Sequence, residues 1–121
     1  MKFTMAHSSI AVKDVERSVE FYKKAVGLKV KSNKDLPHIN LTYMVDAEES
    51  GYELEITLKK DHEGDYNLGE NPVHLAFWVD DYKGALALHQ EMGCVLRVVE
   101  PAGIHFIQDP DGYVTEIMPK A

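Results

Sequence analysis

Apolar and polar residues alternate with the period of a β-strand over residues 7–12 and again over 74–79. A helical spacing of apolar residues follows each alternation. In the first half this stripe comprises Val15, Val19, Tyr22 and Val26. In the second half it comprises Tyr82, Ala85, Leu86 and Met92. The pattern therefore predicts one strand and one amphipathic helix at the start of each half.

Both predicted helices have the same boundary residues. Asp14 and Asp81 precede them as N-caps, and Gly27 and Gly93 follow them as C-terminal stops. Three further strands are predicted in each half, and the last two form a hairpin. The predicted strands cover 28–31, 39–45 and 52–58 in the first half, and 94–99, 104–108 and 113–118 in the second.

Two short sequence motifs each occur once in both halves. Residues 7–14 and 74–81 share the pattern H-x-x-[large apolar]-x-V-x-D, and residues 51–56 and 112–117 share G-Y-x-x-E-I. This internal duplication predicts an α+β fold of tandem βαβββ repeats that form a curved mixed sheet cup, with both helices on one side of the sheets. We expect one domain over 1–121, with repeats at about 1–58 and 73–121 and a polar linker at 59–72.

Composition narrows the classes of partner. The chain has 121 residues, a formal net charge of -7 and only two arginines, which argues against nucleic acid as a ligand. No apolar run approaches the ~20 residues that a membrane span needs. Cys94 is the only cysteine, so neither a disulfide framework nor a thiolate metal cluster is expected. The N-terminus lacks the apolar core of a signal peptide, and a reducing cytoplasm is the expected location.

Each half begins with a histidine on a predicted strand and ends with a glutamate on another. If the halves are related by symmetry, these side chains converge: His7, Glu55, His74 and Glu116. Imidazole and carboxylate ligands without sulfur suit nickel, cobalt, zinc, iron or manganese. Such a dication with open positions polarises a carbonyl and stabilises the enediolate formed by removal of a neighbouring proton. A ligand carboxylate that loosens from the metal is a suitable base.

Other residues compete less well for these roles. Glu53 shares a predicted strand face with Glu55, but only Glu55 aligns with Glu116 in the repeat. Cys94 heads an apolar strand, so a buried and inert thiol is expected. The remaining histidines are assigned structural or surface roles. They are His38, His62, His89 and His105. Of these, His105 is also compatible with a position facing the site.

Several of these segments resemble a known family. They are Ala6–His7, Asp14–Tyr22 with Gly27–Leu28, Glu53–Thr57, Val73–Phe77, and Asp109–Tyr113 leading to Glu116. The chain resembles the vicinal oxygen chelate superfamily over nearly its whole length. The order of the candidate ligands along the chain, His, Glu, His, Glu, is similar to that of the glyoxalase I (lactoylglutathione lyase) branch. Methylmalonyl-CoA epimerase has glutamine at the position of Glu55, and the dioxygenases and fosfomycin-resistance enzymes use two histidines and one glutamate.

The resemblance implies isomerisation of a hemithioacetal, formed from a thiol and methylglyoxal, to a 2-hydroxyacyl thioester. Glu116 is then the expected base, and Glu55 shares the proton transfers. The resemblance also implies a homodimer whose metal sites are completed by both chains. The short chain favours nickel or cobalt, with zinc as a further candidate. The alternatives are another metal enzyme of the superfamily, epimerase-like or dioxygenase-like, and a non-enzymatic ligand-binding module.

The glutathione contacts of the family are altered in this chain. Ala11 stands where the family usually has arginine, and Lys59 stands where it usually has asparagine. The loop before the last hairpin is reduced to 101–103. Glutathione carboxylates need cationic partners, so Lys59 is the predicted substrate-binding residue and partly compensates for the missing arginine.

Overall fold

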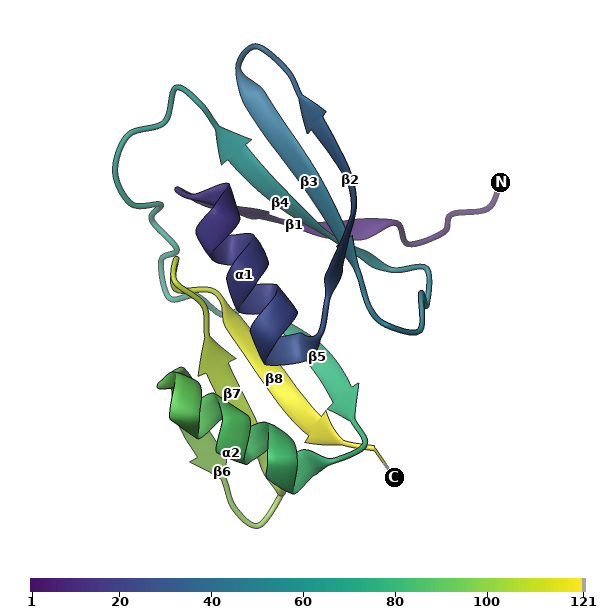
Figure 1. Cartoon of the computed structure of the whole chain (residues 1–121), viewed down its shortest axis with the longest axis vertical. Coiled ribbons are helices and arrows are strands. Elements are labelled where there is room, and N and C mark those ends of the chain that lie inside the picture. The colour runs from purple at the N-terminus through teal and green to yellow at the C-terminus, as the bar shows by residue number, and fades with distance from the viewer. Residues whose placement is uncertain (121) are drawn as a thin grey trace. The chain divides into compact units, whose positions relative to one another are not determined.

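The computed structural model describes residues 1–120, which form two compact units divided after Tyr66 (Figure 1). Both units have the same order of elements. Unit 1 contains β1 (His7–Ala11), α1 (Val15–Val26), β2 (Lys29–Asp35), β3 (Ile39–Val45) and β4 (Glu53–Lys59). Unit 2 contains β5 (His74–Val79), α2 (Tyr82–Met92), β6 (Val95–Val99), β7 (Ile104–Gln108) and β8 (Val114–Pro119). The predicted tandem βαβββ fold is therefore confirmed.

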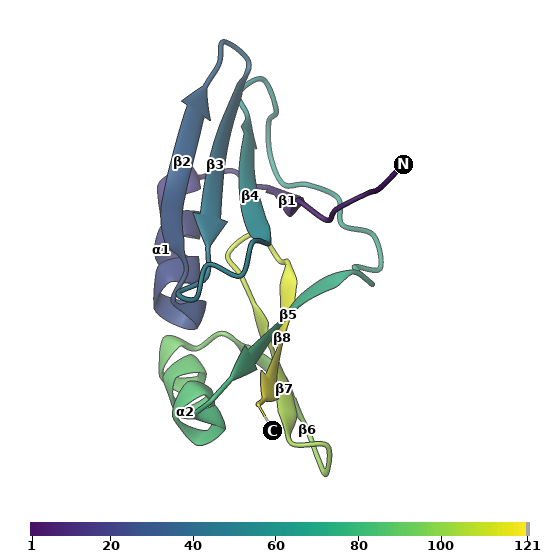
Figure 2. The ribbon, with the colours of Figure 1, turned by 90° about the vertical axis from the view of Figure 1, so that its right-hand side faces the viewer.

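The two sheets have equivalent topologies. Unit 1 has the strand order β1-β4-β3-β2, and unit 2 has β5-β8-β7-β6. In each sheet the first and last strands of the repeat pair in parallel, and the other pairs are antiparallel. Figure 2 shows that α1 and α2 each cover one face of their own sheet. The opposite face of each sheet carries the predicted ligands.

The cap residues confirm the predicted helix boundaries. The Asp14 carboxylate accepts a hydrogen bond from the Arg17 backbone N–H at 3.1 Å, and Asp81 accepts one from the Gly84 N–H at 3.0 Å. Gly27 and Gly93 adopt left-handed conformations with φ of 67° and 70°. Such a conformation lets the backbone N–H satisfy carbonyls of the last turn, and it favours glycine.

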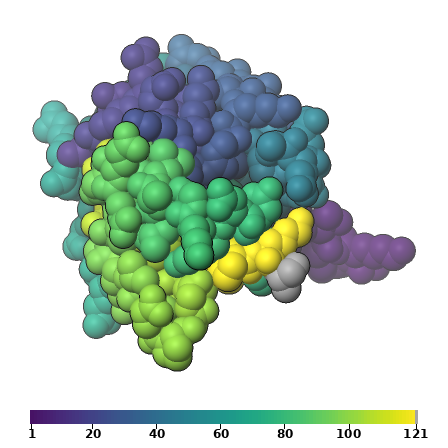
Figure 3. All heavy atoms as spheres, turned by 60° about the horizontal axis from the view of Figure 1, so that its bottom comes forward, coloured from purple at the N-terminus to yellow at the C-terminus, as the bar shows by residue number. Residues whose placement is uncertain are grey.

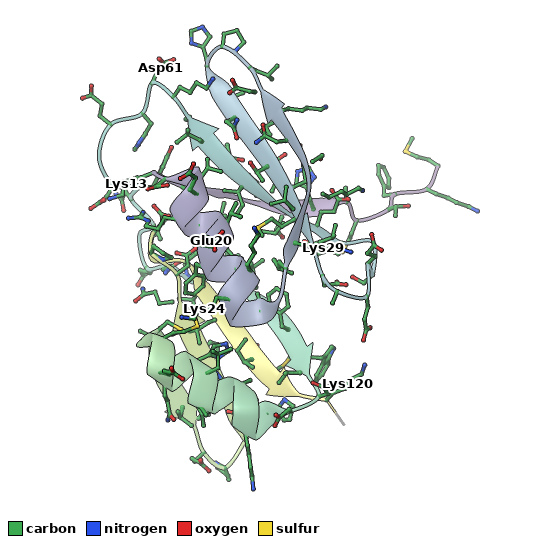
Figure 4. All side chains as sticks on the ribbon, viewed as in Figure 1. Lys13, Glu20, Lys24, Lys29, Asp61 and Lys120 are labelled. Atoms are coloured by element: carbon green, nitrogen blue, oxygen red, sulfur yellow. The ribbon has the colours of Figure 1, made fainter. Side chains whose placement is uncertain are left out.

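The core of unit 1 lies between α1 and its sheet. Val19 and Tyr22 are buried as predicted, together with Met44 and Ile56 from the strands. The outer ends of the predicted helical stripe, Val15 and Val26, are only half-buried. Charged side chains occupy the outer surface of α1, where Glu20 and Lys24 are labelled in Figure 4. This distribution is that of a surface helix with one apolar face.

The strand predicted over 28–31 continues to Asp35, so its predicted end was wrong. Every residue of β2 is exposed, which removes the hydrophobic pattern that would reveal a strand. The strand is held instead by backbone pairing with β3 and by the Asn33 amide, which donates to Thr42 Oγ1 at 2.7 Å. The first residues, drawn dark purple in Figure 3, project away from the other residues of unit 1, and Phe3 is 90% exposed.

No helix within residues 1–120 is long and apolar enough to cross a membrane.

Cys94, the predicted inert thiol, is half-buried, and its Sγ donates to the His89 carbonyl at 3.6 Å. Burial raises the pKa of this thiol, as expected for an unreactive cysteine.

A buried pair of histidines lies in the core of unit 2. His105 Nε2 is 2.7 Å from His89 Nδ1, and His105 Nδ1 is 3.0 Å from the Tyr82 hydroxyl. Both histidines are almost fully buried. His105 points to the α2 side of the sheet, so the option that it faces the site was wrong. His89 was expected at the helix surface or in a structural role, and it has the structural one.

This pair predicts acid sensitivity of folding. Burial, and then the neighbouring His89, lower the pKa of His105 to about 4. The unfolded state, with a histidine pKa of about 6.5, binds the proton first, so folding stability is complete above about pH 6.5 and falls as the pH drops toward 4. Between pH 7.5 and 5, we expect the wild type to lose about 2 kcal/mol more than His105→Gln, measured by urea unfolding.

A surface histidine provides the control for this measurement. His62→Gln should keep the pH dependence of the wild type, because His62 lies in an exposed loop. Equal slopes of stability against pH in the wild type and His105→Gln would contradict the prediction.

Candidate functional site

His7 and Glu55 form the first half of the candidate metal site. His7 begins β1, and the parallel register pairs Ser9 with Glu55. Because His7 and Ser9 are two residues apart on one strand, their side chains and that of Glu55 share one face of the sheet. His7 Nε2 lies 3.4 Å from Glu55 Oε2. The structure therefore brings the two predicted ligands of unit 1 together.

Hydroxyl groups hold the Glu55 carboxylate. The Tyr43 hydroxyl donates to Glu55 Oε2 at 2.5 Å, and the Thr57 hydroxyl donates to Oε1 at 3.1 Å. Burial raises the pKa of Glu55, but hydrogen bonds from Tyr43, Ser9 and Thr57 lower it, and the net shift is downward. The Tyr43 ring also meets the His7 ring edge-on at 5.6 Å between centroids. Glu55 is thus a fixed, ionised oxygen donor.

His74 and Glu116 form the second half of the candidate site. Ala76 pairs with Glu116 across the parallel β5–β8 ladder, and His74 lies two residues before Ala76 on the same face. His74 Nε2 is 3.1 Å from Glu116 Oε1. The Phe106 ring meets the His74 ring edge-on at 5.5 Å. The geometry repeats that of unit 1 with phenylalanine in the place of Tyr43.

This replacement makes the two carboxylates unequal. Phe106 has no hydroxyl, and within residues 1–120 His74 is the only hydrogen-bond or ion-pair partner of the Glu116 carboxylate. Glu55, in contrast, accepts bonds from Tyr43 and Thr57. Glu116 is therefore the less constrained of the two oxygen donors.

The competing carboxylate in unit 1 has a different partner. Glu53 Oε2 pairs with Lys31 Nζ at 2.5 Å rather than with a histidine. This ion pair supports the choice of Glu55 over Glu53 as the candidate ligand.

Each unit contributes two donors. Within residues 1–120, no group of three or more His, Cys, Asp or Glu side chains has the geometry to hold a metal ion. The donors themselves, one imidazole nitrogen and one carboxylate per unit, match the chemistry of a nitrogen- and oxygen-ligated dication. The sequence prediction that all four residues bind one ion remains a prediction. In the structure, each unit by itself brings one histidine and one glutamate together, and we call each such pair a half-site.

Lys59, the predicted substrate-binding residue, ends β4 and lines a pocket of about 370 Å³ in unit 1. Its amine has no ion pair within the described residues 1–120. The His62 ring stacks on the Tyr66 ring at 3.8 Å in the same pocket. The complete lining is Val12, Lys13, Leu58, Lys59, Lys60, His62, Gly64 and Tyr66. Figure 4 labels Lys13 near the start of α1 and Asp61 in the loop after β4.

Two site residues are absent from the sequence prediction. Tyr43 and Phe106 lie at equivalent positions in β3 and β7, each directly opposite a candidate glutamate in the antiparallel ladder. Alignment of the two predicted hairpins was the signal that could have found them. It would have placed an aromatic residue beside each glutamate, although not the hydroxyl contact itself.

The fold is that of one class of protein. The sequence model of the Glyoxalase/Bleomycin resistance protein/Dioxygenase superfamily matches residues 4–117. The chain belongs to this superfamily, which confirms the resemblance expected from the sequence motifs.

Two relatives and one solved structure show which members of the superfamily this chain is similar to. The chain is 32% identical to lactoylglutathione lyase of Neisseria meningitidis serogroup A, covering 96% of this chain and 90% of the relative. It is 30% identical to lactoylglutathione lyase of Escherichia coli O157:H7, covering 94% and 90%. The structure of the trypanothione-dependent glyoxalase I of Leishmania major superposes with a TM-score of 0.86 at 30% identity, covering 98% and 87%. The prediction of a lyase similar to lactoylglutathione lyase is therefore confirmed.

Proposed function

We propose that this chain isomerises the hemithioacetal of methylglyoxal and a small thiol to a 2-hydroxyacyl thioester. The observation that carries the proposal is the repetition of one His–Glu pair at equivalent positions of the two units, at 3.4 and 3.1 Å. Lactoylglutathione lyases are among its relatives at 30% identity or more, which supports the same reaction.

His7, Glu55, His74 and Glu116 would hold a divalent metal. The family implies such an ion, and two carboxylates would neutralise its charge. Nickel or cobalt is favoured because the chain resembles the short bacterial type, and zinc is the further candidate. When bound, the ion would polarise the substrate carbonyl and so acidify the adjacent C–H group.

Glu116 is the proposed base. Its carboxylate removes the proton from the carbon that bears the sulfur and the hydroxyl group, and returns it to the former carbonyl carbon. The hydroxyl proton moves to the former carbonyl oxygen, so that the 2-hydroxyacyl thioester is an isomer of the hemithioacetal. The smaller number of contacts around Glu116 supports this role, because a base must move between its resting position and the substrate. Glu55, restrained by the Tyr43 and Thr57 hydroxyls, orients the site and shares the proton transfers.

A homodimer is proposed to complete the site. Each unit presents only one imidazole and one carboxylate, so four ligands require a unit 1 and a unit 2 to face each other. We propose that these come from different chains of a symmetric dimer, as the family implies, and that the two repeats of one chain act as a single functional domain. Isologous pairing would create two equivalent sites.

Lys59 is proposed to contact the thiol portion of the substrate. It follows Glu55 along β4 and is on the same strand face, because the two residues are four apart. The Lys59 amine has no ion pair in residues 1–120, which leaves it available to a substrate carboxylate.

A cytoplasmic location is also proposed, since a small-thiol substrate requires a reducing compartment.

The relatives point to more than one thiol. The chain has the same 30% identity to the Escherichia coli lactoylglutathione lyase and to the trypanothione-dependent glyoxalase I of Leishmania major. Glutathione and trypanothione are therefore both candidate thiols.

The decisive assay is methylglyoxal turnover by protein loaded with nickel, cobalt or zinc. Glutathione, trypanothione and 2-mercaptoethanol would be compared as thiols, and metal content would be measured by elemental analysis. We expect turnover that depends on metal, with at least one thiol, and higher rates with nickel or cobalt than with zinc. Protein that holds metal but turns over none of these hemithioacetals would reject the proposed function.

A further inference from the structure

The N-terminal arm, residues 1–5, carries a row of exposed apolar side chains. Met1, Phe3 and Met5 alternate with polar residues, which is the period of a strand with one apolar face. All three side chains are exposed, and Figure 1 shows the arm running from the start of β1 away from the other elements of unit 1. Exposed apolar side chains that gather in one segment mark an interaction site.

The arm continues an edge strand. Within the part of the chain that the structure describes, β1 pairs only with β4. Glu53 begins β4, and its N–H donates to the Ala6 carbonyl at 3.2 Å, so the ladder ends just before the arm. An unpaired strand edge offers its backbone donors and acceptors to another chain. In an extended arm, side chains alternate, so Phe3 and Met5 lie on the same face as His7.

Unit 2 has an exposed aromatic residue on the ligand face of its own edge strand. In the described residues, β5 pairs only with β8, and it carries Trp78 four residues after His74. Trp78 therefore shares the face of His74, and it is 66% exposed. The motif that both halves share places Ala11 at this position in unit 1. A large ring here is therefore not a requirement of the fold.

The proposed metal site fixes how these two edge strands would meet. If one ion binds both histidines, His7 of one chain lies opposite His74 of a second copy. The half-sites are equivalent, so a local twofold axis through the ion would relate them. An axis along the strands would turn the two ligand faces in opposite directions. An axis normal to the sheet keeps both faces toward the ion and makes β1 antiparallel to β5 of the second copy.

Counting from the histidine pair gives the register of the arm. In antiparallel strands, the residue n positions before one member of a pair lies opposite the residue n positions after the other. Met5 then lies opposite Ala76, and Phe3 lies opposite Trp78. Both rings of the second pair are exposed in the separate chain. Aromatic side chains directly opposite each other stabilise paired strands.

We propose that the N-terminal arm pairs as a strand with β5 of a second copy of this chain, with Phe3 packed against Trp78. This inference rests on the proposed function, because the shared metal site sets the register. Twofold symmetry would place the contact twice in each dimer. The aromatic pair would hold two half-sites in register without itself binding the metal.

Disulfide trapping tests the register directly. Phe3→Cys and Trp78→Cys would be made separately in a Cys94→Ser background, unfolded and refolded together, and oxidised. Opposite residues on antiparallel strands have the Cα separation of about 4.5 to 5.5 Å that a disulfide accepts. We expect a covalent heterodimer on non-reducing gels. Lys2→Cys in the place of Phe3→Cys is the matched control and should give far less covalent dimer, since its side chain projects from the other face.

Association of the chain without added cysteines gives a second readout. Trp78 is the only tryptophan, and its fluorescence should shift to shorter wavelength as rising concentration forms the dimer. For Phe3→Ala at saturating metal, we expect the dissociation constant of the dimer to rise about 30- to 300-fold by sedimentation equilibrium, because two aromatic contacts are lost. Leu36→Ala removes an exposed apolar side chain between β2 and β3, and it should change this constant less than about threefold.

The outcomes separate this inference from the proposed function. A wild-type dimer that gives no crosslink between positions 3 and 78, or that Phe3→Ala does not weaken, would overturn the inference and leave the shared site intact. A wild type that stays monomeric at saturating metal would overturn both the inference and the shared site. Crosslinking at the expected positions, in a metal-loaded wild type that turns over no hemithioacetal, would support the arm contact and reject the proposed reaction alone.

Discussion

Glu116→Gln is expected to lower kcat by about 10²- to 10⁴-fold, the usual contribution of a positioned general base. Glutamine is close to glutamate in size and still offers one oxygen toward His74, but its amide cannot accept the substrate proton. The loss should therefore exceed the loss of bound metal, measured by elemental analysis of the same preparation. The kinetics would be recorded at saturating metal, so that the chemical step is compared directly.

Glu55→Gln is the matched control because the same substitution is made in the equivalent carboxylate. It keeps the Tyr43 contact in part but weakens a fixed ligand, so reduced metal content should be its main effect. If Glu116→Gln retained full metal and the full rate, Glu116 would not be the base. A loss of activity that followed metal content in both variants would assign a ligand role to both residues and a proton-transfer role to neither.

Activity should return when two inactive variants are mixed. His7→Ala damages the half-site of unit 1, and His74→Ala damages that of unit 2. In a symmetric dimer with shared sites, a hybrid of the two chains has one doubly altered site and one intact site. After unfolding and refolding of an equal mixture, we expect about a quarter of the wild-type activity, since half of the dimers are hybrids with one intact site.

A mixture of two variants from the same unit supplies the control. His7→Ala with Glu55→Gln places both changes in unit 1, so every hybrid site contains one altered residue and activity should stay at the level of the separate variants. If the His7→Ala and His74→Ala mixture also stayed inactive while hybrids were detected by mass spectrometry, all four ligands would come from one chain and the shared dimer site would be rejected.

Much of the architecture was accessible from the sequence because duplication gives every signal twice. Asp14 and Gly27 bound one helix, Asp81 and Gly93 bound the other, and the structure places helices between both pairs. The His–Glu pairs were likewise found by comparing the halves. A parallel register between the first and last strand of a repeat then brings each pair together, which periodicity alone does not specify.

Other features depend on contacts that have no sequence signal. The exposed strand β2 lacks alternation, so its extension to Asp35 rests on hydrogen bonds with β3. His89 lies on a helix and His105 on a strand, and only their packing reveals that they share a hydrogen bond in the core. The Tyr43 hydroxyl contact with Glu55 depends in the same way on register and rotamer.

Two separate half-sites with two ligands each bind a dication more weakly than one site with four ligands. An isolated unit of this protein would release a dication readily, whereas two facing half-sites would retain it. Under the proposed dimer, cation loading and subunit association are thermodynamically linked, and each strengthens the other. Diluted protein would then lose its ion, and added ion would favour association, so the cell's supply of the metal would also control how much of the protein is assembled.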